Sequence, residues 1–279
     1  MDNLKGLLML CVVLGHFCEQ YELTHPNLKY IIFFIYLFHM PCFIYISGYF
    51  SKKYSFKKNS KLIYQYIIFA LIYLSIVNRF PGINIKFEIS RTPWSLWYLI
   101  SLFYWRTIAH FIKTPNIPFT ITLSFIFAIF VGCFKNIGDY FSLARTIGFF
   151  PFFLLGYYSN ELTLQKIRKI NKPLIILAIF VILLCTYFIV STNWIPLNFQ
   201  WSSKSFYELG IDNIHGIIYK IVLLILEILC CIILINIMPQ EKTIFSMFGE
   251  NTITIYGFHT SIVFVITYFI KDVTYKGSI

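Results

Sequence analysis

The chain has 279 residues, of which 58% are hydrophobic and only 13% are charged. Soluble domains have about 45–50% apolar and about 25% charged residues, so this composition excludes a soluble enzyme. A mean hydropathy of +0.72 also excludes a disordered or fibrous chain. Because one membrane-spanning helix takes about 20 apolar residues plus a connector, residues 1–279 have room for about nine spans in a single membrane domain.

The net charge is +11, and most of the 23 Lys and Arg residues stand in short loops between apolar runs. We therefore place this charge relative to a membrane and expect no nucleic-acid partner. The seven cysteines form no Cys-x-x-Cys pair, so the sequence predicts neither a disulfide framework nor a bound metal. We interpret the cysteines as small apolar residues.

Apolar runs between charged or proline-rich breaks predict the helices in chain order. The first run follows Asp2 and lacks a basic leader and a cleavage site, so it indicates a retained helix and not a signal peptide. The stretch 191–213 has room for a re-entrant segment, so the expected fold is an all-α, polytopic integral membrane bundle of about nine, eight to ten, helices. The nine runs are 4–21, 28–50, 62–80, 94–112, 119–134, 143–158, 174–190, 214–238 and 252–270.

Two loops carry most of the clustered positive charge: residues 52–61 follow the second run, and residues 166–172 follow the sixth. Cytoplasmic loops carry an excess of Lys and Arg, so both loops, and with them the N-terminus, are predicted to face the cytoplasm. With nine spans the C-terminus would lie outside, and so would the seventh loop at 191–213. That loop could contact a sugar or be an ordinary solvated loop.

Ionisable side chains inside apolar runs are costly in lipid and mark candidate functional residues. Lys5 and His16 are eleven residues apart, which on an α-helix is three turns plus about 20° with a rise of about 16 Å. One helix face could therefore present a cation near the cytoplasmic surface and an imidazole past the midplane. Alternatively, Lys5 reaches back to the interface and His16 bonds a neighbouring helix. The full set is Lys5, His16, His39, Arg145, Glu227 and His259.

Glu19 follows His16 by three residues, so its carboxylate could hold one ring nitrogen and raise the basicity of the other, as a general base requires. It could equally be the polar end of the helix. His39 precedes Pro41, whose missing backbone donor leaves a carbonyl to be satisfied by a neighbour, water or ligand. With His259, three imidazoles on three helices are difficult to explain as packing alone.

Lys220 precedes Glu227 by seven residues on one helix face, so the favoured interpretation of both is a structural ion pair. Arg145 begins the sixth run, where it could be an interfacial anchor or an anion contact. Trp94 and Trp97 fit an interfacial aromatic belt first and a substrate wall second.

Five segments together resemble a known family. They are a basic residue, ten positions and a histidine at 5–16, Phe-His-Met-Pro with Ser-Gly-Tyr-Phe at 38–50, Trp-Ser-Leu-Trp-Tyr-Leu at 94–99, Arg145 with 149–156, and Gly-Glu-Asn-Thr with the last histidine at 249–259. In this order they resemble the acyltransferase family 3 integral membrane proteins, within them the branch similar to fucose 4-O-acetylase. The resemblance covers nearly the whole chain, although the basic residue is Lys5 where many members have Arg.

The resemblance implies transfer of an acyl group, usually acetyl, from cytoplasmic acyl-CoA to a hydroxyl of a cell-surface polysaccharide or lipid-linked sugar. The protein would be a multi-pass protein of the cytoplasmic membrane. His16 would remove the hydroxyl proton as general base, with Glu19 as its orienting residue. Lys5, Lys52 and Lys53 would hold the phosphates of CoA, since cations match a polyanionic cofactor.

The remaining candidates would act around the reacting atoms. His39, Ser47 and His259 would donate hydrogen bonds to the thioester oxyanion or to the acceptor sugar, although Ser47-Gly48 also suits close helix packing. The candidate substrate contacts are Trp94, Trp97 and Arg145. A covalent acyl-histidine intermediate is the alternative to direct transfer. A different class of function also fits: a polysaccharide exporter or flippase that uses the histidines as a proton relay, although the sequence has no inverted repeat.

Overall fold

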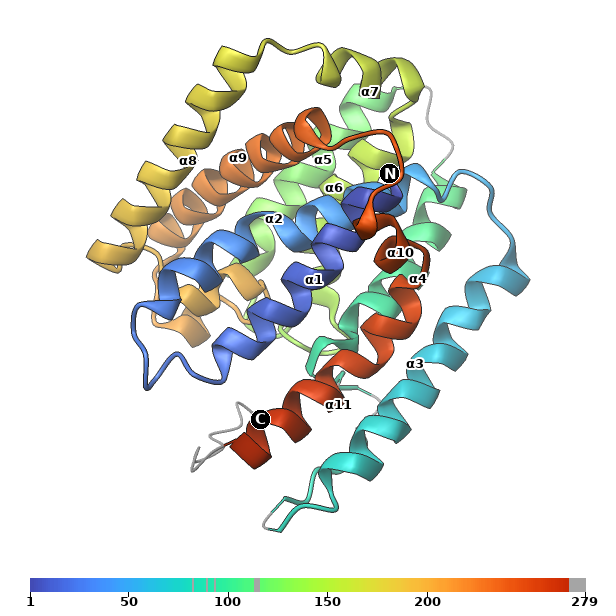
Figure 1. The fold of residues 1–279 in the computed structure, drawn as a ribbon, viewed down its shortest axis with the longest axis vertical. Helices are drawn as coiled ribbons and strands as arrows, with labels where there is room; N and C mark the ends of the chain where they lie inside the picture. Colours follow the sequence, from blue (N-terminus) through green and yellow to red (C-terminus); the bar gives the residue numbers. More distant parts are fainter. Residues whose placement is uncertain (82, 89, 93, 113–115, 271–279) are drawn as a thin grey trace.

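The computed structural model describes residues 1–81, 83–88, 90–92, 94–112 and 116–270, and every regular element in this part of the chain is helical (Figure 1). The α-helices are α1 (Asp2–Glu19), α2 (Leu28–Tyr49), α3 (Phe56–Val77), α4 (Trp97–Phe111), α5 (Ile117–Phe130), α6 (Leu143–Tyr158), α7 (Glu161–Arg168), α8 (Lys172–Thr192), α9 (Asn213–Ile237), α10 (Ile244–Glu250) and α11 (Thr252–Ile270). Short 3-10 turns are η1 (Trp94–Leu96), η2 (Val131–Cys133), η3 (Leu197–Trp201) and η4 (Tyr207–Leu209). The all-α fold class expected from composition is confirmed.

Each of the nine predicted apolar runs carries a helix. Five of the described helices, α2, α3, α8, α9 and α11, are long and apolar enough to cross a membrane. By contrast, α1 has 18 residues and includes Asp2, Lys5 and Glu19, and α4 and α6 have 15 and 16 residues. A span perpendicular to the bilayer takes about 20 residues, so the count of nine spans stays a prediction.

Two short helices, α7 and α10, lie outside the predicted runs. The eight residues of α7 are largely polar, and the helix begins with a capping box in which Asn160 and Thr163 satisfy each other's backbone N–H groups. Helix α10 has seven residues and is capped by Thr243, whose side chain accepts from the N–H of Phe245. Both helices are too short for an apolar-run search, which detects long segments.

Helix α2 packs against α1, α6, α8 and α9 (Figure 1). It crosses α6 at two glycines: a Cβ on Gly48 would overlap the carbonyl of Phe153, and a Cβ on Gly156 would overlap the carbonyl of Tyr45. Small residues let two helix backbones approach this closely in a membrane protein. Gly48 of the Ser-Gly motif therefore serves helix packing, which leaves the serine of that motif for other contacts.

The segment after α8 folds back into one end of the bundle. The side-chain amide of Gln200 donates to the carbonyl of Phe33 on α2 at 3.2 Å, and the N–H of Phe206 donates to the carbonyl of Gly132 at 2.7 Å. The ring of Phe206 fills the space that side chains on Gly132 and Gly216 would occupy. Part of the predicted outer loop is thus buried structure that holds α2, η2 and α9 together.

The predicted ion pair between Lys220 and Glu227 does not form a direct contact. Both residues are described and buried, yet no contact within 4 Å joins their charged atoms. The Nζ atom of Lys220 instead donates to the hydroxyl of Ser202 at 2.9 Å. Seven residues on a helix rise about 10.5 Å, a distance that only long side chains bent toward each other can bridge, and the inserted loop offers Lys220 a nearer partner.

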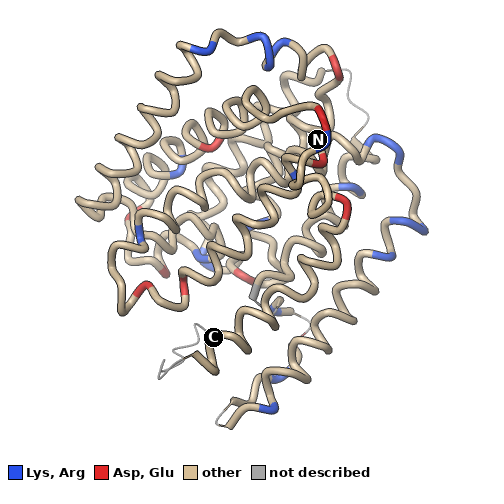
Figure 2. Tube along the Cα trace, in the orientation of Figure 1, with Lys and Arg blue, Asp and Glu red and all other residues tan. Residues whose placement is uncertain are grey.

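The charged loops divide between the two ends of the molecule (Figure 2). The loop between α2 and α3 and the α7 segment, which carry the clustered Lys and Arg residues, lie toward the same end as the N-terminus. Helix α11 ends toward the opposite end, where acidic positions also stand in the loop that follows α1. This is the relative arrangement that the positive-inside pattern predicts.

Candidate functional site

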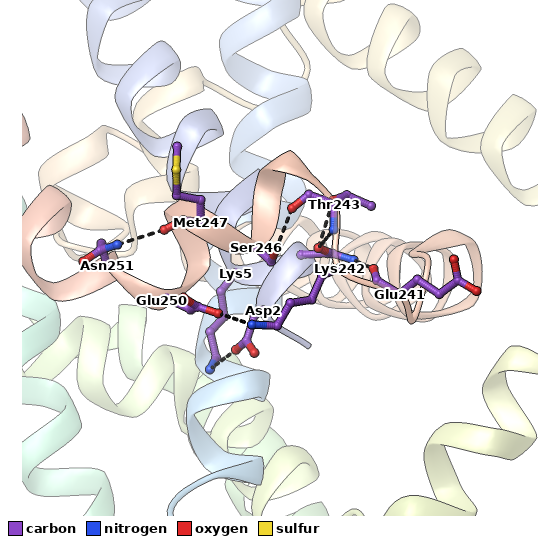
Figure 3. Close-up of polar contacts among 10 residues, drawn as sticks. Asp2, Lys5, Glu241, Lys242, Thr243, Ser246, Met247, Glu250 and Asn251 are labelled. Atoms are coloured by element: carbon purple, nitrogen blue, oxygen red, sulfur yellow. Dashed lines mark hydrogen bonds and ion pairs between the residues drawn. The ribbon is translucent and has the colours of Figure 1, made fainter.

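The start of α1, which carries Lys5 and leads to His16, is held against α10 (Figure 3). The side-chain amide of buried Asn3 donates to the carbonyl of Glu241 at 2.6 Å, and its oxygen accepts from the N–H and the hydroxyl of Thr243 at 3.1 and 2.9 Å. A Cβ on Gly249 would overlap the Asp2 carbonyl, so the two backbones touch. Asn3 is not among the residues predicted for the site, and only its place two residues before Lys5 distinguishes it in the sequence.

His16, near the C-terminal end of α1, makes hydrogen bonds through one ring nitrogen. Its Nδ1 lies 2.7 Å from the Glu19 carboxylate, which also accepts a hydrogen bond from the hydroxyl of Tyr36 on α2. The same hydroxyl lies 3.2 Å from Nδ1 of His16. A carboxylate oxygen only accepts, so Nδ1 carries the proton and Nε2 of the neutral ring is an acceptor. Tyr36 is a site residue that the sequence did not reveal, because nothing distinguishes it from the other 19 of the chain's 20 tyrosines.

The three histidines lie together. The rings of His16 and His259 stack at 5.3 Å between centroids, and the ring of His39 meets that of Tyr36 edge-on at 4.6 Å. His39 and His259 are both 2% exposed. The structure thus gathers α1, α2 and α11 around one group of imidazoles, and among the described residues no set of three His, Cys, Asp or Glu side chains is arranged to hold a metal.

The hydrogen bonds of His39 and His259 define their neutral tautomers. Nδ1 of His39 lies 2.9 Å from the Ile35 carbonyl, and Nδ1 of His259 lies 2.7 Å from the Tyr256 carbonyl. Since carbonyl oxygens only accept, both Nδ1 atoms donate and both Nε2 atoms are acceptors when the rings are neutral. Nε2 of His259 lies 3.3 Å from the hydroxyl of Ser95, which can donate to it.

A cavity of about 160 Å³ lies between α1, α2, α3, α4 and α11, on the side of the histidines toward the N-terminus of α1. Lys5 and Ser47, both predicted cofactor contacts, line it together. The hydroxyls of Ser47 and Tyr98 are 2.5 Å apart, and the ring of Tyr256 lies 5.5 Å from that of His259. The polar lining residues are Lys5, Ser47, Tyr98, Arg106, Thr252 and Tyr256.

Lys52 and Lys53 do not line this cavity. Helix α2 ends at Tyr49, and Lys52 then reaches toward α6, where it donates to the carbonyl of Ser159 and lies over the ring of Tyr49 at 4.7 Å. Lys53 is exposed. The turn after α2 thus directs these two cations away from the space that Lys5 shares with Ser47.

Trp97 and Arg145, two of the three predicted substrate contacts, do not line the cavity. Trp97 is buried and stacks on Phe149 at 5.6 Å, and the guanidinium carbon of Arg145 lies 5.4 Å from its ring centroid. Arg145 also donates through Nε to the carbonyl of Trp201 and lies 3.6 Å from the carboxylate of Asp139. Trp97 and Arg145 are therefore in contact with each other. Trp94 is the first residue of η1, and its side chain is outside the described part of the chain.

Comparisons with known proteins place this arrangement in a family. A family model described as an acyltransferase domain matches residues 1–276, which include every described helix, the histidines and the cavity. Comparisons with curated proteins and with solved structures gave no match. The family model covers far more than half of the chain, and five of the described helices have the length and hydropathy of membrane spans. The chain belongs to acyltransferase family 3 and is a membrane acyltransferase.

Proposed function

We propose that this protein transfers an acyl group, foremost acetyl, from cytoplasmic acyl-CoA to a hydroxyl of a cell-surface polysaccharide or lipid-linked sugar, as in the fucose 4-O-acetylase-like branch. It would act in the cytoplasmic membrane with its N-terminus in the cytoplasm. One observation supports this above all: the His16 imidazole, bonded to Glu19, lies beside two more imidazoles near a cavity that Lys5 lines. Tyr256 lines the cavity and its ring lies 5.5 Å from that of His259, so a thioester held beside Tyr256 would be close to the imidazoles.

Lys5 and His16 are 11 residues apart on one continuous helix, a rise of about 16 Å. This span is comparable to an extended pantetheine arm. In our proposal Lys5 binds a CoA phosphate at the cytoplasmic end, and the arm runs past Ser47 and Tyr98 toward the histidines.

His16 then acts as general base. Nε2 of His16 takes the proton of the sugar hydroxyl while the oxygen of that hydroxyl attacks the thioester carbonyl carbon. Glu19 stabilises the resulting imidazolium through its contact with Nδ1. When the tetrahedral intermediate collapses, the carbon–sulfur bond breaks and the imidazolium returns the proton to the leaving thiolate. The products are the sugar ester and free CoA.

The tautomers of His39 and His259 indicate which substrate groups these residues can bind. With Nδ1 bonded to a backbone carbonyl, neutral His39 and His259 present accepting Nε2 atoms, so they suit the acceptor hydroxyl better than an oxyanion. A hydroxyl donor suits the oxyanion. The Ser47 hydroxyl donates to the carbonyl of Phe43, so Tyr98 donates to Ser47, and in our proposal the Tyr98 O–H turns from Ser47 to the oxyanion as it forms.

The test measures ester-linked acetyl on surface glycan by proton NMR in cells with the wild-type protein, a deletion or His16→Ala, with total exported glycan quantified in the same samples. Loss of acetyl at unchanged glycan yield is the expected result. Unchanged acetyl with glycan retained inside the cell would refute transfer and favour an exporter. Full activity of His16→Ala would refute its role as base.

A further inference from the structure

The cavity has a second cation, which is not among the residues predicted for the site. Arg106 on α4 lines it together with Lys5 on α1, so two helices bring positive charge to one space. Nε of Arg106 donates to the hydroxyl of Ser51 at 3.0 Å, and that hydroxyl donates to the carbonyl of Ser47 at 2.5 Å. This chain of hydrogen bonds fixes the guanidinium against the end of α2.

Lys5 and Arg106 differ in whether a carboxylate lies near their positive charge. Nζ of Lys5 is 3.0 Å from the carboxylate of Asp2 and 4.1 Å from the ring centroid of Phe50. Within the described residues, no carboxylate lies within 4 Å of the Arg106 guanidinium, which is only partly exposed. A partly buried cation without a carboxylate partner is suited to an anionic ligand, and a guanidinium can hold a phosphate through two parallel hydrogen bonds.

The length of the cavity along α4 also suits a long ligand. Arg106 and Tyr98 both line the cavity and are eight residues apart on α4, a rise of about 12 Å. The ring of Tyr98 meets that of Tyr256 at 5.4 Å, and Tyr256 lies beside His259. The cavity therefore has a cationic end at Lys5 and Arg106 and an end near the imidazoles.

We propose that Arg106 binds the diphosphate of the CoA donor bidentately, with Lys5 as the second cation on the facing helix. This inference rests on the proposed function, and it places the phosphate contacts on Lys5 and Arg106 and not on Lys52 or Lys53. The shared ligand chemistry is a phosphate ester, which a lipid headgroup also carries.

The test measures CoA binding by calorimetry to full-length protein in nanodiscs of phosphatidylcholine. Arg106→Gln should raise the Kd for CoA at least about tenfold, because it removes charge-assisted hydrogen bonds to a phosphate. Arg106→Lys keeps the positive charge but cannot donate two parallel hydrogen bonds, so it should raise the Kd for CoA by a smaller factor. Pantetheine, which lacks the diphosphate, should bind equally to the wild type and to both variants. The matched control is Lys169→Gln, which removes an exposed cation outside the cavity and should leave the Kd unchanged.

Equal CoA affinity of wild type and Arg106→Gln would overturn the assignment while leaving the acyl-CoA donor in place. If Arg106→Gln lost affinity equally for CoA and for pantetheine, the assignment would also be overturned, since the effect would not involve the diphosphate. If phosphatidylglycerol in the discs stabilises the wild type but not Arg106→Gln, and CoA binding is equal, the arginine binds a lipid phosphate instead. No CoA binding by the wild type would refute the donor itself, and with it both proposals.

Discussion

The rings of His16 on α1 and His259 on α11 stack with 5.3 Å between their centroids and 28° between their planes. These residues come from opposite ends of the sequence, so the stack joins the first described helix to the last. Two positive charges at this separation repel strongly in a low-dielectric site. When His16 takes a proton, His259 is therefore expected to stay neutral and to hold the first ring in place.

His259→Asn should lower kcat about tenfold to hundredfold and leave the KM for acyl-CoA nearly unchanged. Asparagine can still donate to the Tyr256 carbonyl, as Nδ1 does, but it removes the stacked ring and Nε2. Small misplacements of a catalytic group cost up to about 10²-fold in rate. Steady-state kinetics on purified protein checks this. Ser95→Ala, which removes only the hydroxyl beside Nε2, should cost less, and an unchanged kcat in His259→Asn would contradict the supporting role.

Glu19→Gln should lower kcat about 10²-fold or more, because glutamine can accept the Nδ1 hydrogen bond but cannot stabilise the imidazolium. Tyr36→Phe removes only the hydroxyl that donates to the carboxylate, so its loss should be smaller. The measurement is the rate of CoA release with saturating donor. A Tyr36→Phe enzyme slower than Glu19→Gln would show that the hydroxyl itself takes part in the chemistry.

Local periodicity predicted one part of this site and could not predict the other. The shared face of Lys5 and His16 follows from helix geometry within one segment, and the contact of His16 with Glu19 follows from a three-residue spacing. Tyr36 and Arg106 reach the site across helix pairs, and no property of one sequence fixes which helices neighbour each other. The same limit explains Lys220, which a seven-residue spacing assigned to Glu227 but an inserted loop binds through Ser202.

Gly156→Ala should destabilise the protein by about 1–3 kcal/mol, the usual cost of forcing extra volume into a packed site. Its Cβ would overlap the Tyr45 carbonyl on α2, and a backbone atom cannot rotate away. Gly148→Ala on the same helix is the matched control, because its Cβ would lie 3.5 Å from the nearest atom. Thermal unfolding in detergent checks both, and equal midpoints for the two variants would contradict the close crossing.

The loop between α8 and α9 gives a pH-dependent prediction. The Ser205 hydroxyl donates to the Glu208 carboxylate at 2.7 Å and holds the pKa of that carboxyl below its ordinary value of 4.5. A lowered folded-state pKa stabilises the fold above the ordinary pKa, and this contribution is lost as the pH falls through the folded-state pKa. Ser205→Ala should therefore lower the unfolding midpoint most at neutral pH, and its difference from wild type should shrink in acid.

Ser191→Ala supplies the control for this prediction, since the hydroxyl of Ser191 donates to a carbonyl that does not titrate. Its difference from wild type should be independent of pH. The measurement is the unfolding midpoint of the three proteins in detergent between neutral pH and the acid limit of solubility. If the difference in unfolding midpoint between Ser205→Ala and wild type stays constant into acid, the hydroxyl does not act through the Glu208 carboxylate. It would then act by accepting the hydrogen bond that the N–H of Glu208 donates to it at 3.3 Å.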